Sequence, residues 1–342
     1  ETDIKTILSD VNPVNNWTIP KYFPVTNHTA INFMLGVIRM NQSHLEIPKI
    51  GKMMNATINT GLSHIYAMCA VDGKELVAVV GQTRDKKYVL NMYDLKRHDP
   101  VWSHLLSGES WGICQINLNG KSAFVYSVHC EGKLYQIEMH GNDATVLYAA
   151  KNFEPTCIAN KTDNTILVVN QKPNPKSVLV ISLCATDESL KSICTDTINT
   201  HMDKSIDDLC FVQQGDIIVC ISYLSGIICG IDATAGNKKL WSLLPQKAAT
   251  RWQIKEIQDK FIINPRGVCM KPGTNVMYFT DYKSKSVISC IVEPDRIDYI
   301  GEFLKHADIV RNPMRICWCS TSDSLVISSY EDGYPITWLT AI

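Results

Sequence analysis

The chain has 342 residues, of which 45% are hydrophobic, and its 33 Lys and Arg residues nearly balance 34 Asp and Glu residues. This composition excludes a disordered or collagen-like protein and lets the chain bury a large core, either as two ordinary domains or as one large all-β unit. The small net charge excludes attraction of the whole molecule to nucleic acid or to an anionic membrane, so such binding would need a local patch.

The N-terminal segment, 1–43, is expected to lead into the fold, with a short helix where apolar residues recur at helical spacing before Pro13. Because the sequence starts at Glu1 without Met or a signal pattern, we expect a processed chain or a domain of a longer protein. The segments 44–50 and 53–58 are candidate strands. The longest apolar stretch, 217–231, is too short to cross a bilayer, so no membrane partner is expected.

From residue 63 onward, one pattern recurs six times. Each unit places a cysteine in a short apolar run, followed by a polar turn and a second, β-branched run. The cysteines are Cys69, Cys114, Cys157, Cys210, Cys269 and Cys317, and the second runs are 76–80, 123–127, 166–170, 217–221, 276–280 and 325–329. Gly, Asn and Asp in the turns favour tight hairpins. A third strand follows each hairpin and a fourth follows in five units.

Six repeats of four antiparallel strands are typical of a β-propeller. We therefore expect an all-β fold with a single six-bladed β-propeller over 44–342. The blades are expected at about 63–104, 110–150, 154–198, 206–242, 264–301 and 312–342. The sixth unit ends after three strands, so a strand from 44–60 is expected to close it.

Thirteen cysteines leave the compartment open. Their spacing does not predict a zinc site, and buried, reduced thiols would place the protein in the cytoplasm. Secretion is the alternative, with possible disulfides between Cys184 and Cys194 and between Cys220 and Cys229. Five N-x-S/T sequons favour that alternative: Asn16, Asn27, Asn41, Asn55 and Asn160.

The fifth unit carries a recognisable motif: Asn264-Pro265-Arg266-Gly267-Val268-Cys269, then Gly273, then a strand that ends in Asp281. It resembles the NHL repeat, and the sixth unit retains part of it around Pro313. Lys238 to Trp241 is also reminiscent of quinoprotein propellers. The NHL resemblance implies the C-terminal domain of a tripartite-motif ubiquitin ligase, which binds RNA or protein, with the ligase activity and any oligomerisation in upstream segments.

No catalytic constellation, metal site or cofactor is expected. The G-x-S-x-G sequence around Ser110 leads into a strand rather than a helix, and the adjacent carboxylates Asp207 and Asp208 are interpreted as solvated loop ends. The enzymatic alternative is a secreted propeller that resembles calcium-dependent lactonases and esterases or strictosidine synthase, or a ligand carrier that uses the tunnel. The predicted inner strands offer only Asn117 and Asn160 as oxygen ligands, which disfavours calcium.

The best candidate site is the face that carries the loops between strands two and three and between blades. Cations and aromatic rings alternate there, which suits single-stranded RNA or an acidic protein segment. An amphipathic helix is expected between residues 243 and 265. The candidate contact residues are Arg84, Lys87, Lys172, Arg251, Trp252, Arg266, Tyr282, Lys283, Arg315 and Tyr330.

Overall fold

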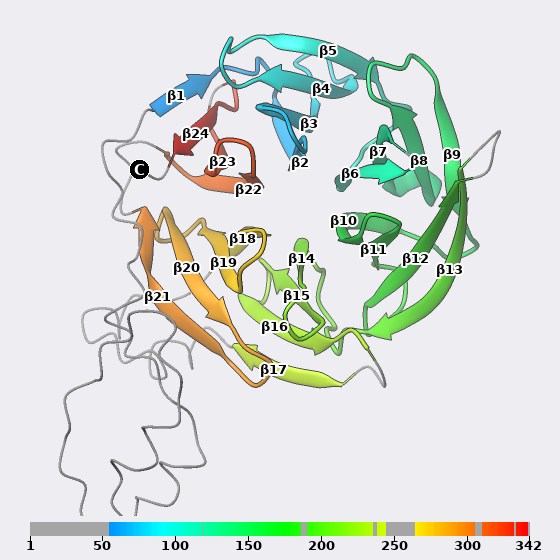
Figure 1. Ribbon diagram of the computed structural model, residues 1–342, viewed down its shortest axis with the longest axis vertical. Coiled ribbons are helices and arrows are strands. Elements are labelled where there is room, and N and C mark those ends of the chain that lie inside the picture. Colours follow the sequence, from blue (N-terminus) through cyan, green and yellow to red (C-terminus); the bar gives the residue numbers. More distant parts are fainter. Residues whose placement is uncertain are drawn as a thin grey trace, which may run out of the picture. The chain divides into compact units, whose positions relative to one another are not determined.

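The computed structural model describes residues 55–118, 120–185, 190–234, 238–243, 264–304, 310–331 and 333–340, all within one compact unit, Ile47–Ile342. Their strands form six four-stranded antiparallel sheets arranged as the blades of a propeller around a central axis (Figure 1). We call the region along this axis the channel. The expected fold is confirmed. Among the described residues, no helix is long and apolar enough to cross a membrane.

Each blade runs from an inner strand beside the channel to an outer strand at the rim (Figure 1). Blade 1 contains β2 (His64–Ala70), β3 (Leu76–Gln82), β4 (Tyr88–Asp94) and β5 (Pro100–Leu105); blade 2 contains β6 (Ile113–Leu118), β7 (Lys121–Val128), β8 (Lys133–Glu138) and β9 (Ala144–Ala149); blade 3 contains β10 (Pro155–Thr162), β11 (Thr165–Asn170), β12 (Ser177–Ala185) and β13 (Leu190–Asn199). Blade 4 contains β14 (Asp208–Val212), β15 (Ile217–Ser222), β16 (Ile227–Asp232) and β17 (Lys239–Leu243); blade 5 contains β18 (Pro265–Met270), β19 (Val276–Asp281), β20 (Ser286–Val292) and β21 (Ile297–Leu304); blade 6 contains β22 (Pro313–Cys319), β23 (Ser324–Ser329) and β24 (Ile336–Thr340).

An N-terminal strand completes blade 6. β1 (Asn55–Ile58) pairs antiparallel with β24, and Asn55 faces Leu339 while Ile58 faces Ile336. Of the two candidate closing strands, 53–58 is therefore the one that supplies β1, and 44–50 lies outside the described residues, as do the helices expected near the N-terminus and between 243 and 265. This closure gives the last blade the same four strands as the others.

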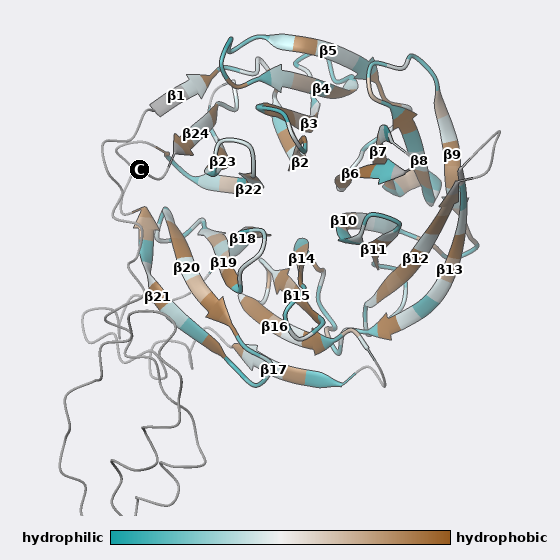
Figure 2. Cartoon of the chain, viewed as in Figure 1, coloured by the Kyte–Doolittle hydropathy of each residue, from teal (hydrophilic) through white to brown (hydrophobic). Residues whose placement is uncertain are grey.

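The cysteine pattern marks an equivalent position in all six inner strands. Each of these side chains packs into the apolar cluster between its own blade and the next: Cys317 lies with Ile65 and Val77, and Cys210 lies with Val268. Figure 2 shows that hydrophobic residues also dominate the middle strands, such as β16 and β20. The cysteine therefore repeats because its side chain fills an equivalent space between each pair of neighbouring blades.

All thirteen cysteines are free thiols. Cys220 and Cys229 lie directly opposite each other in β15 and β16, as expected of a cross-strand pair, but they are not joined. Cys184 faces Lys191, so the expected pairing of Cys184 with Cys194 is wrong in register. Burial raises the pKa of Cys114 and of Cys157 well above that of a free thiol.

Two glycines let inner strands approach the next blade closely. A Cβ added to Gly267 would lie 2.6 Å from the Met314 carbonyl oxygen, and one added to Gly112 would overlap the Thr156 carbonyl oxygen. Both glycines lie two residues before the repeated cysteine of their blade. The glycine of the NHL-like motif is thus required by inter-blade packing rather than by turn geometry.

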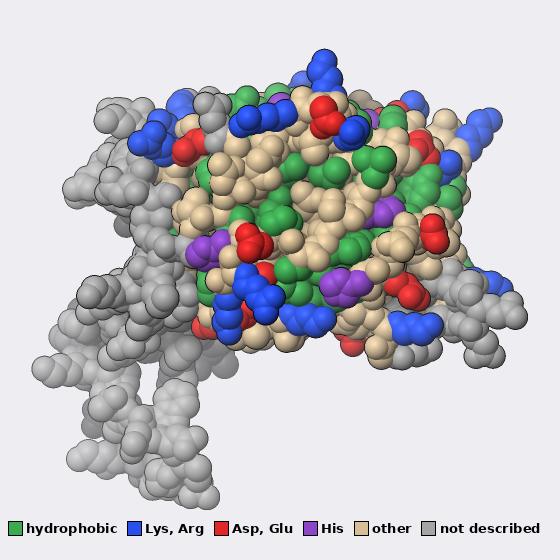
Figure 3. All heavy atoms as spheres, turned by 90° about the horizontal axis from the view of Figure 1, so that it is seen from above, with side chains coloured by type: hydrophobic (Ala, Val, Ile, Leu, Met, Phe, Trp, Pro, Cys, Tyr) green, Lys and Arg blue, Asp and Glu red, His purple; other side chains and the backbone are tan. Residues whose placement is uncertain are grey.

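The outer wall differs from the two loop faces. Figure 3 shows the side that carries β4 and β5, where most Lys and Arg lie toward the two rims and the band between them is mainly hydrophobic and polar, with a few acidic and histidine side chains. On β5, Val101 and Leu105 are exposed by 40% and 62%. This wall supplies reference positions against which substitutions on a loop face can be compared.

Candidate binding site at the channel mouth

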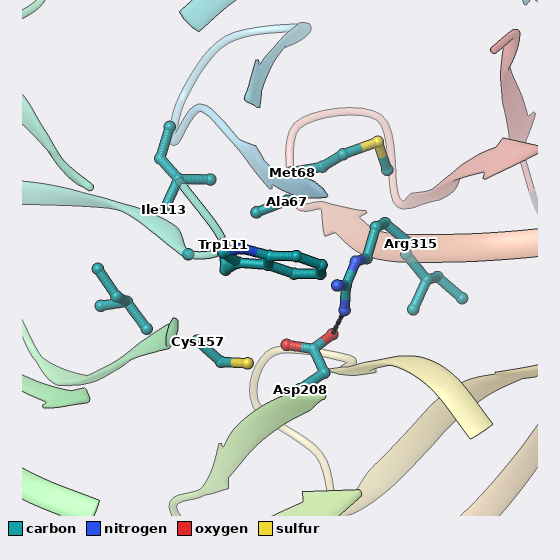
Figure 4. A pocket seen from close by; sticks show the side chains of 10 residues that line it. Ala67, Met68, Trp111, Ile113, Cys157, Asp208 and Arg315 are labelled. Carbon is teal, nitrogen blue, oxygen red and sulfur yellow. Dashed lines mark ion pairs between the residues drawn. The ribbon is translucent and has the colours of Figure 1, made fainter. Parts of the chain in front are cut away.

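The channel narrows to a small cavity where the inner strands begin. The residue two positions before the repeated cysteine lines it in four blades: Ala67, Gly112, Asp208 and Arg315. Trp111 and Cys157 also line it, and Figure 4 shows Trp111, Asp208 and Arg315 projecting into it from different blades. Its volume of about 30 Å³ accommodates water rather than a cofactor.

Arg315 links three blades across this cavity. From β22 its Nη1 donates hydrogen bonds to the carbonyl oxygens of Asp207 (2.7 Å) and Arg266 (2.9 Å) and lies 4.0 Å from the Asp208 carboxylate. Only 7% of Arg315 is exposed, and its Nε is buried without a hydrogen-bond partner among the described residues. The sequence places Arg315 on an inter-blade loop of the binding face; its main role is instead to connect blades 4, 5 and 6.

Asp207 and Asp208, the two carboxylates next to Arg315, are not the solvated loop ends that the sequence suggests. Asp208 is the first residue of β14, accepts a hydrogen bond from the Val268 backbone N–H, and retains only 21% side-chain exposure. Burial raises the pKa of Asp208 from 3.8 to about 6, against the opposing effect of Arg315. Burial also raises the pKa of Asp207. An inner strand therefore does contribute a carboxylate, one residue before the predicted start of that strand.

Eight aromatic side chains form a continuous arc around the mouth of the channel on the loop face. We call this set the aromatic arc: Tyr223, Tyr282, Tyr330, Tyr334, His64, Tyr66, Tyr88 and Trp111. Neighbouring ring centroids are 4.9 to 6.5 Å apart, with 4.9 Å between Tyr66 and Trp111 and 6.5 Å between Tyr223 and Tyr282. The arc crosses blades 4, 5, 6, 1 and 2 in that order.

One end of the aromatic arc is filled by a cation of the chain itself. The Arg266 guanidinium lies 2.9 Å from the ring centroid of Tyr223 and 5.5 Å from that of Tyr282. We call this group the filled sector. A buried carboxylate holds each tyrosine-bearing loop: Asp207 accepts a hydrogen bond from the Tyr223 backbone N–H, and Asp281 accepts three, from the backbone N–H groups of residues 264 and 283 and from a serine hydroxyl.

The other end is built from similar parts but holds no such cation. Tyr66 contacts both Trp111 and Tyr88, and the Glu109 carboxylate lies near the Tyr66 hydroxyl. Burial, and then the Glu109 charge, raises the pKa of Tyr66 and that of Tyr88. Among the described residues, no Lys or Arg lies over these three rings and none forms an ion pair with Glu109. We call this group the open sector.

The other residues expected at the site fall into three groups. Lys87 and Lys172 are exposed but paired, each at 2.8 Å, with Asp85 and Glu154. Tyr330 and Tyr282 belong to the aromatic arc. Arg84 and Lys283 are exposed on loops of this face and have no ion pair among the described residues. Arg251 and Trp252 lie outside the described residues.

The open sector is absent from the expected site, although the sequence holds a signal for part of it. Tyr66, Trp111 and Arg266 each lie three residues before the repeated cysteine of their blade, so they project from equivalent positions at the mouth. The next position of the same repeat, two residues before the repeated cysteine, is occupied by Asp208 in blade 4 and by Arg315 in blade 6. Tyr88 and Glu109 carry no such mark: Tyr88 begins β4, Glu109 comes from the loop before β6, and the cysteine repeat marks neither position.

The two candidates for catalytic chemistry at this mouth are the serine of the G-x-S-x-G sequence and a cluster of metal-binding side chains. Ser110 of the G-x-S-x-G sequence is fully buried in the loop before β6, and its hydroxyl lies 3.4 Å from the Gly112 carbonyl oxygen. Within the part of the chain that the structure describes, no three His, Cys, Asp or Glu side chains are grouped so that they could hold a metal ion.

Comparisons with known proteins give a fold and no family. No family model matches the chain, and no curated protein matches its sequence. Among solved structures, it is similar to the β-propeller domain of Cps50 (Swd1) from Myceliophteria thermophila, with a TM-score of 0.52, 11% sequence identity and coverage of 80% of this chain and 82% of that one. The chain shares a fold with that domain. At this identity the likeness shows that architecture alone.

Proposed function

We propose that the protein is a non-enzymatic binding module that recruits a partner protein through the loop face around the channel mouth. The observation that carries this proposal is the aromatic arc, which is continuous over five blades of the face. Aromatic side chains offer large contact area at small entropic cost and dominate the energetics of protein interfaces. The 45% exposure of Tyr330 leaves part of the arc open to a partner.

The distribution of charge favours protein over RNA as the partner. Binding of a nucleic-acid backbone needs several cations that are free to meet phosphates. Of the six described cations expected to serve this purpose, Arg315 is buried, Arg266 lies against Tyr223, and Lys87 and Lys172 are already paired, which leaves Arg84 and Lys283. Two rings of the arc, those of Tyr66 and Tyr88, also lie near the Glu109 carboxylate, which would repel phosphate.

The sequence resemblance of blade 5 to the NHL repeat supports the same kind of function. Propellers of that kind in tripartite-motif proteins recruit protein or RNA, and a ligase activity would then reside in another part of a longer chain. In this proposal the protein acts in the cytoplasm and needs no cofactor. The secreted enzyme or ligand carrier that would use the tunnel is less favoured, because the cavity at the mouth has room only for water.

The test is affinity capture with matched variants. Wild-type protein, a loop-face variant (Tyr330→Ser) and an outer-wall variant (Leu105→Ser) are each immobilised, and captured proteins and RNA are quantified from the same lysate. Both substitutions remove one exposed apolar side chain, so nonspecific effects should be equal. We expect one set of proteins to be reduced at least about fivefold by Tyr330→Ser and unchanged by Leu105→Ser.

Two outcomes would overturn the proposal. If Tyr330→Ser and Leu105→Ser reduce capture equally, the loop face is not the binding surface. If RNA is captured and protein is not, and the capture falls steeply with salt, the partner class is wrong.

A further inference from the structure

We propose that the open sector is a receptor for an arginine side chain of the partner protein. The partly exposed rings of Tyr88 and Trp111 would stack on the guanidinium, and the Glu109 carboxylate would accept its hydrogen bonds. Both rings contact the buried ring of Tyr66. This inference rests on the proposed function, because it names the chemistry that the partner must present at the loop face.

The filled sector provides the internal reference for this chemistry. There Arg266 stacks on Tyr223 at 2.9 Å and reaches Tyr282 at 5.5 Å. Burial lowers the pKa of Arg266, and the charge of the nearby Asp207 opposes this effect. The same fold therefore already holds a guanidinium against tyrosine rings, with a carboxylate in the vicinity. Planar stacking is a property of arginine that lysine lacks, which is why arginine is the committed ligand.

The open sector has similar parts, aromatic rings and a carboxylate, although only two of its three rings share a repeat position with Arg266. Trp111 occupies the position in blade 2 that Arg266 occupies in blade 5, three residues before the repeated cysteine. Its ring centroid lies 4.9 Å from that of Tyr66 at an interplanar angle of 53°, so the two rings are inclined rather than stacked. Tyr88 meets Tyr66 at 6.3 Å and 42°. The open sector therefore has an aromatic ring where the filled sector has a cation, so a cation that stacks on its rings would have to come from a partner.

Charge complementarity selects a cation over a neutral apolar group. Glu109 is partly exposed and lies near the Tyr66 hydroxyl, and its carboxylate has acceptor positions for further hydrogen bonds. No Lys or Arg among the described residues forms an ion pair with it or lies over the three rings. A guanidinium would satisfy the carboxylate and the ring faces at once.

The experiment uses the whole chain and a minimal probe, the capped tripeptide Ac-Gly-Arg-Gly-NH2. Its matched control is Ac-Gly-citrulline-Gly-NH2, which keeps the planar shape and lacks the charge. Binding is followed by the indole N–H resonance of Trp111, which is assigned from its loss in Trp111→Phe. We expect the arginine peptide to shift this resonance saturably and the citrulline peptide to leave it unchanged.

A second readout does not depend on Trp111. Cys130 is exposed, and Tyr88 and the Glu109-bearing loop are its neighbours, whereas Cys184 is exposed at the end of β12, away from the open sector. The arginine peptide should slow alkylation of Cys130 and leave that of Cys184 unchanged. Glu109→Gln and Tyr88→Leu should each weaken the arginine effect about fivefold, while Tyr282→Leu in the filled sector should leave it unchanged.

The outcomes separate this inference from the proposed function. If the arginine peptide neither shifts Trp111 nor protects Cys130, or if citrulline acts equally, the arginine receptor is overturned, and the Tyr330→Ser capture experiment still decides the function. If the peptide binds and Glu109→Gln abolishes binding while captured proteins are unaffected by loop-face variants, the receptor stands and the recruiting function fails. If lysine and arginine peptides bind equally, the assigned ligand is wrong.

Discussion

The filled and open sectors lie at opposite ends of one aromatic arc, and one repeat position sets a cation in the first against a ring in the second. Three residues before the repeated cysteine, blade 5 carries Arg266 and blade 2 carries Trp111. In the first case the chain supplies its own cation and the rings of Tyr223 and Tyr282 are engaged. In the second case the chain supplies one more ring. In a repeat protein, a change of side chain at one repeat position can thus replace an internal cation by an aromatic ring while the backbone of the blade stays the same.

The filled sector is also the part of the mouth where structure depends most on charge. Arg315 donates a hydrogen bond to the carbonyl oxygen of Arg266 itself and connects three blades with Asp207 and Asp208. Trp111 of the open sector, in contrast, only lines the same cavity. Substitutions in and below the filled sector should therefore affect stability, and substitutions in the open sector should affect binding. Four sets of substitutions can test this division between the two ends of the arc.

Replacement of Arg315 by Met should have the largest effect. It leaves the buried Asp208 carboxylate without its cation and removes two hydrogen bonds to backbone carbonyls. We expect the free energy of unfolding at pH 7.5 to fall by about 4 kcal/mol in urea titrations. Lys121→Met, at an exposed site, should change it by less than about 0.5 kcal/mol. A loss below about 1 kcal/mol for Arg315→Met would show that the link between the blades is dispensable.

The pH dependence of stability should depend on Asp208. Its pKa is about 6 in the folded protein against 3.8 for an ordinary carboxyl, so the folded state binds this proton more tightly than the unfolded state does. The resulting stabilisation is complete below about pH 4 and is lost as the pH rises through 6, and it amounts to at most about 3 kcal/mol. Subtracting the stability of Asp208→Asn from that of the wild type at each pH should isolate this slope. A flat difference between pH 4 and 6.5 would contradict it.

Alanine at the two close-approach glycines should destabilise both ends of the arc alike. Gly267→Ala and Gly112→Ala each force a Cβ against the backbone of the next blade, and we expect a loss of about 2 to 3 kcal/mol in thermal or urea unfolding. Blades 2 and 5 should respond equally, because this contact belongs to the ring and not to either sector. A large effect in one blade only would mean that the two sectors differ in backbone packing as well.

Replacement of Arg266 by Gln should lower the free energy of unfolding less than replacement of Arg315 or of either glycine does. It also tests whether the filled sector can bind an arginine side chain supplied from outside. Loss of the Arg266 stacking on Tyr223 should lower the free energy of unfolding by about 1 kcal/mol. The vacated rings should then accept a second equivalent of Ac-Gly-Arg-Gly-NH2 in calorimetry. If stoichiometry stays at one, the filled sector is not equivalent to the open sector, and the internal reference for arginine binding is lost.

Much of the architecture is predictable because it repeats. The six cysteines predict the inner strands, since each must fill the same space between blades, and alternating β-branched runs predict the hairpins beside them. The sequence predicts that an N-terminal strand closes blade 6, because that blade lacks a fourth strand. Which N-terminal segment does so is ambiguous until the pairing with β24 is known. The NHL-like glycine in blade 5 is also explained once the neighbouring backbone is in place.

The site is less predictable because it combines single residues from different repeats. Asp208 reads as part of a loop, since Asp is rare in inner strands, and its partner Arg315 is distant in sequence and buried in another blade. Sequence position alone assigns cations to the loop face, and it does not reveal that Lys87 and Lys172 have acidic partners. Tyr88 and Glu109 meet only because adjacent blades bring their loops together.

The pairing of β1 with β24 has a consequence for how the protein is made. On the ribosome, β1 emerges before every other described strand, yet its partner is the last of them to be synthesised. Until then β1 has an unsatisfied backbone edge, and the five complete blades form an open crescent with exposed apolar ends. The ring of blades is therefore closed by a long-range contact that cannot form until β24 has been synthesised.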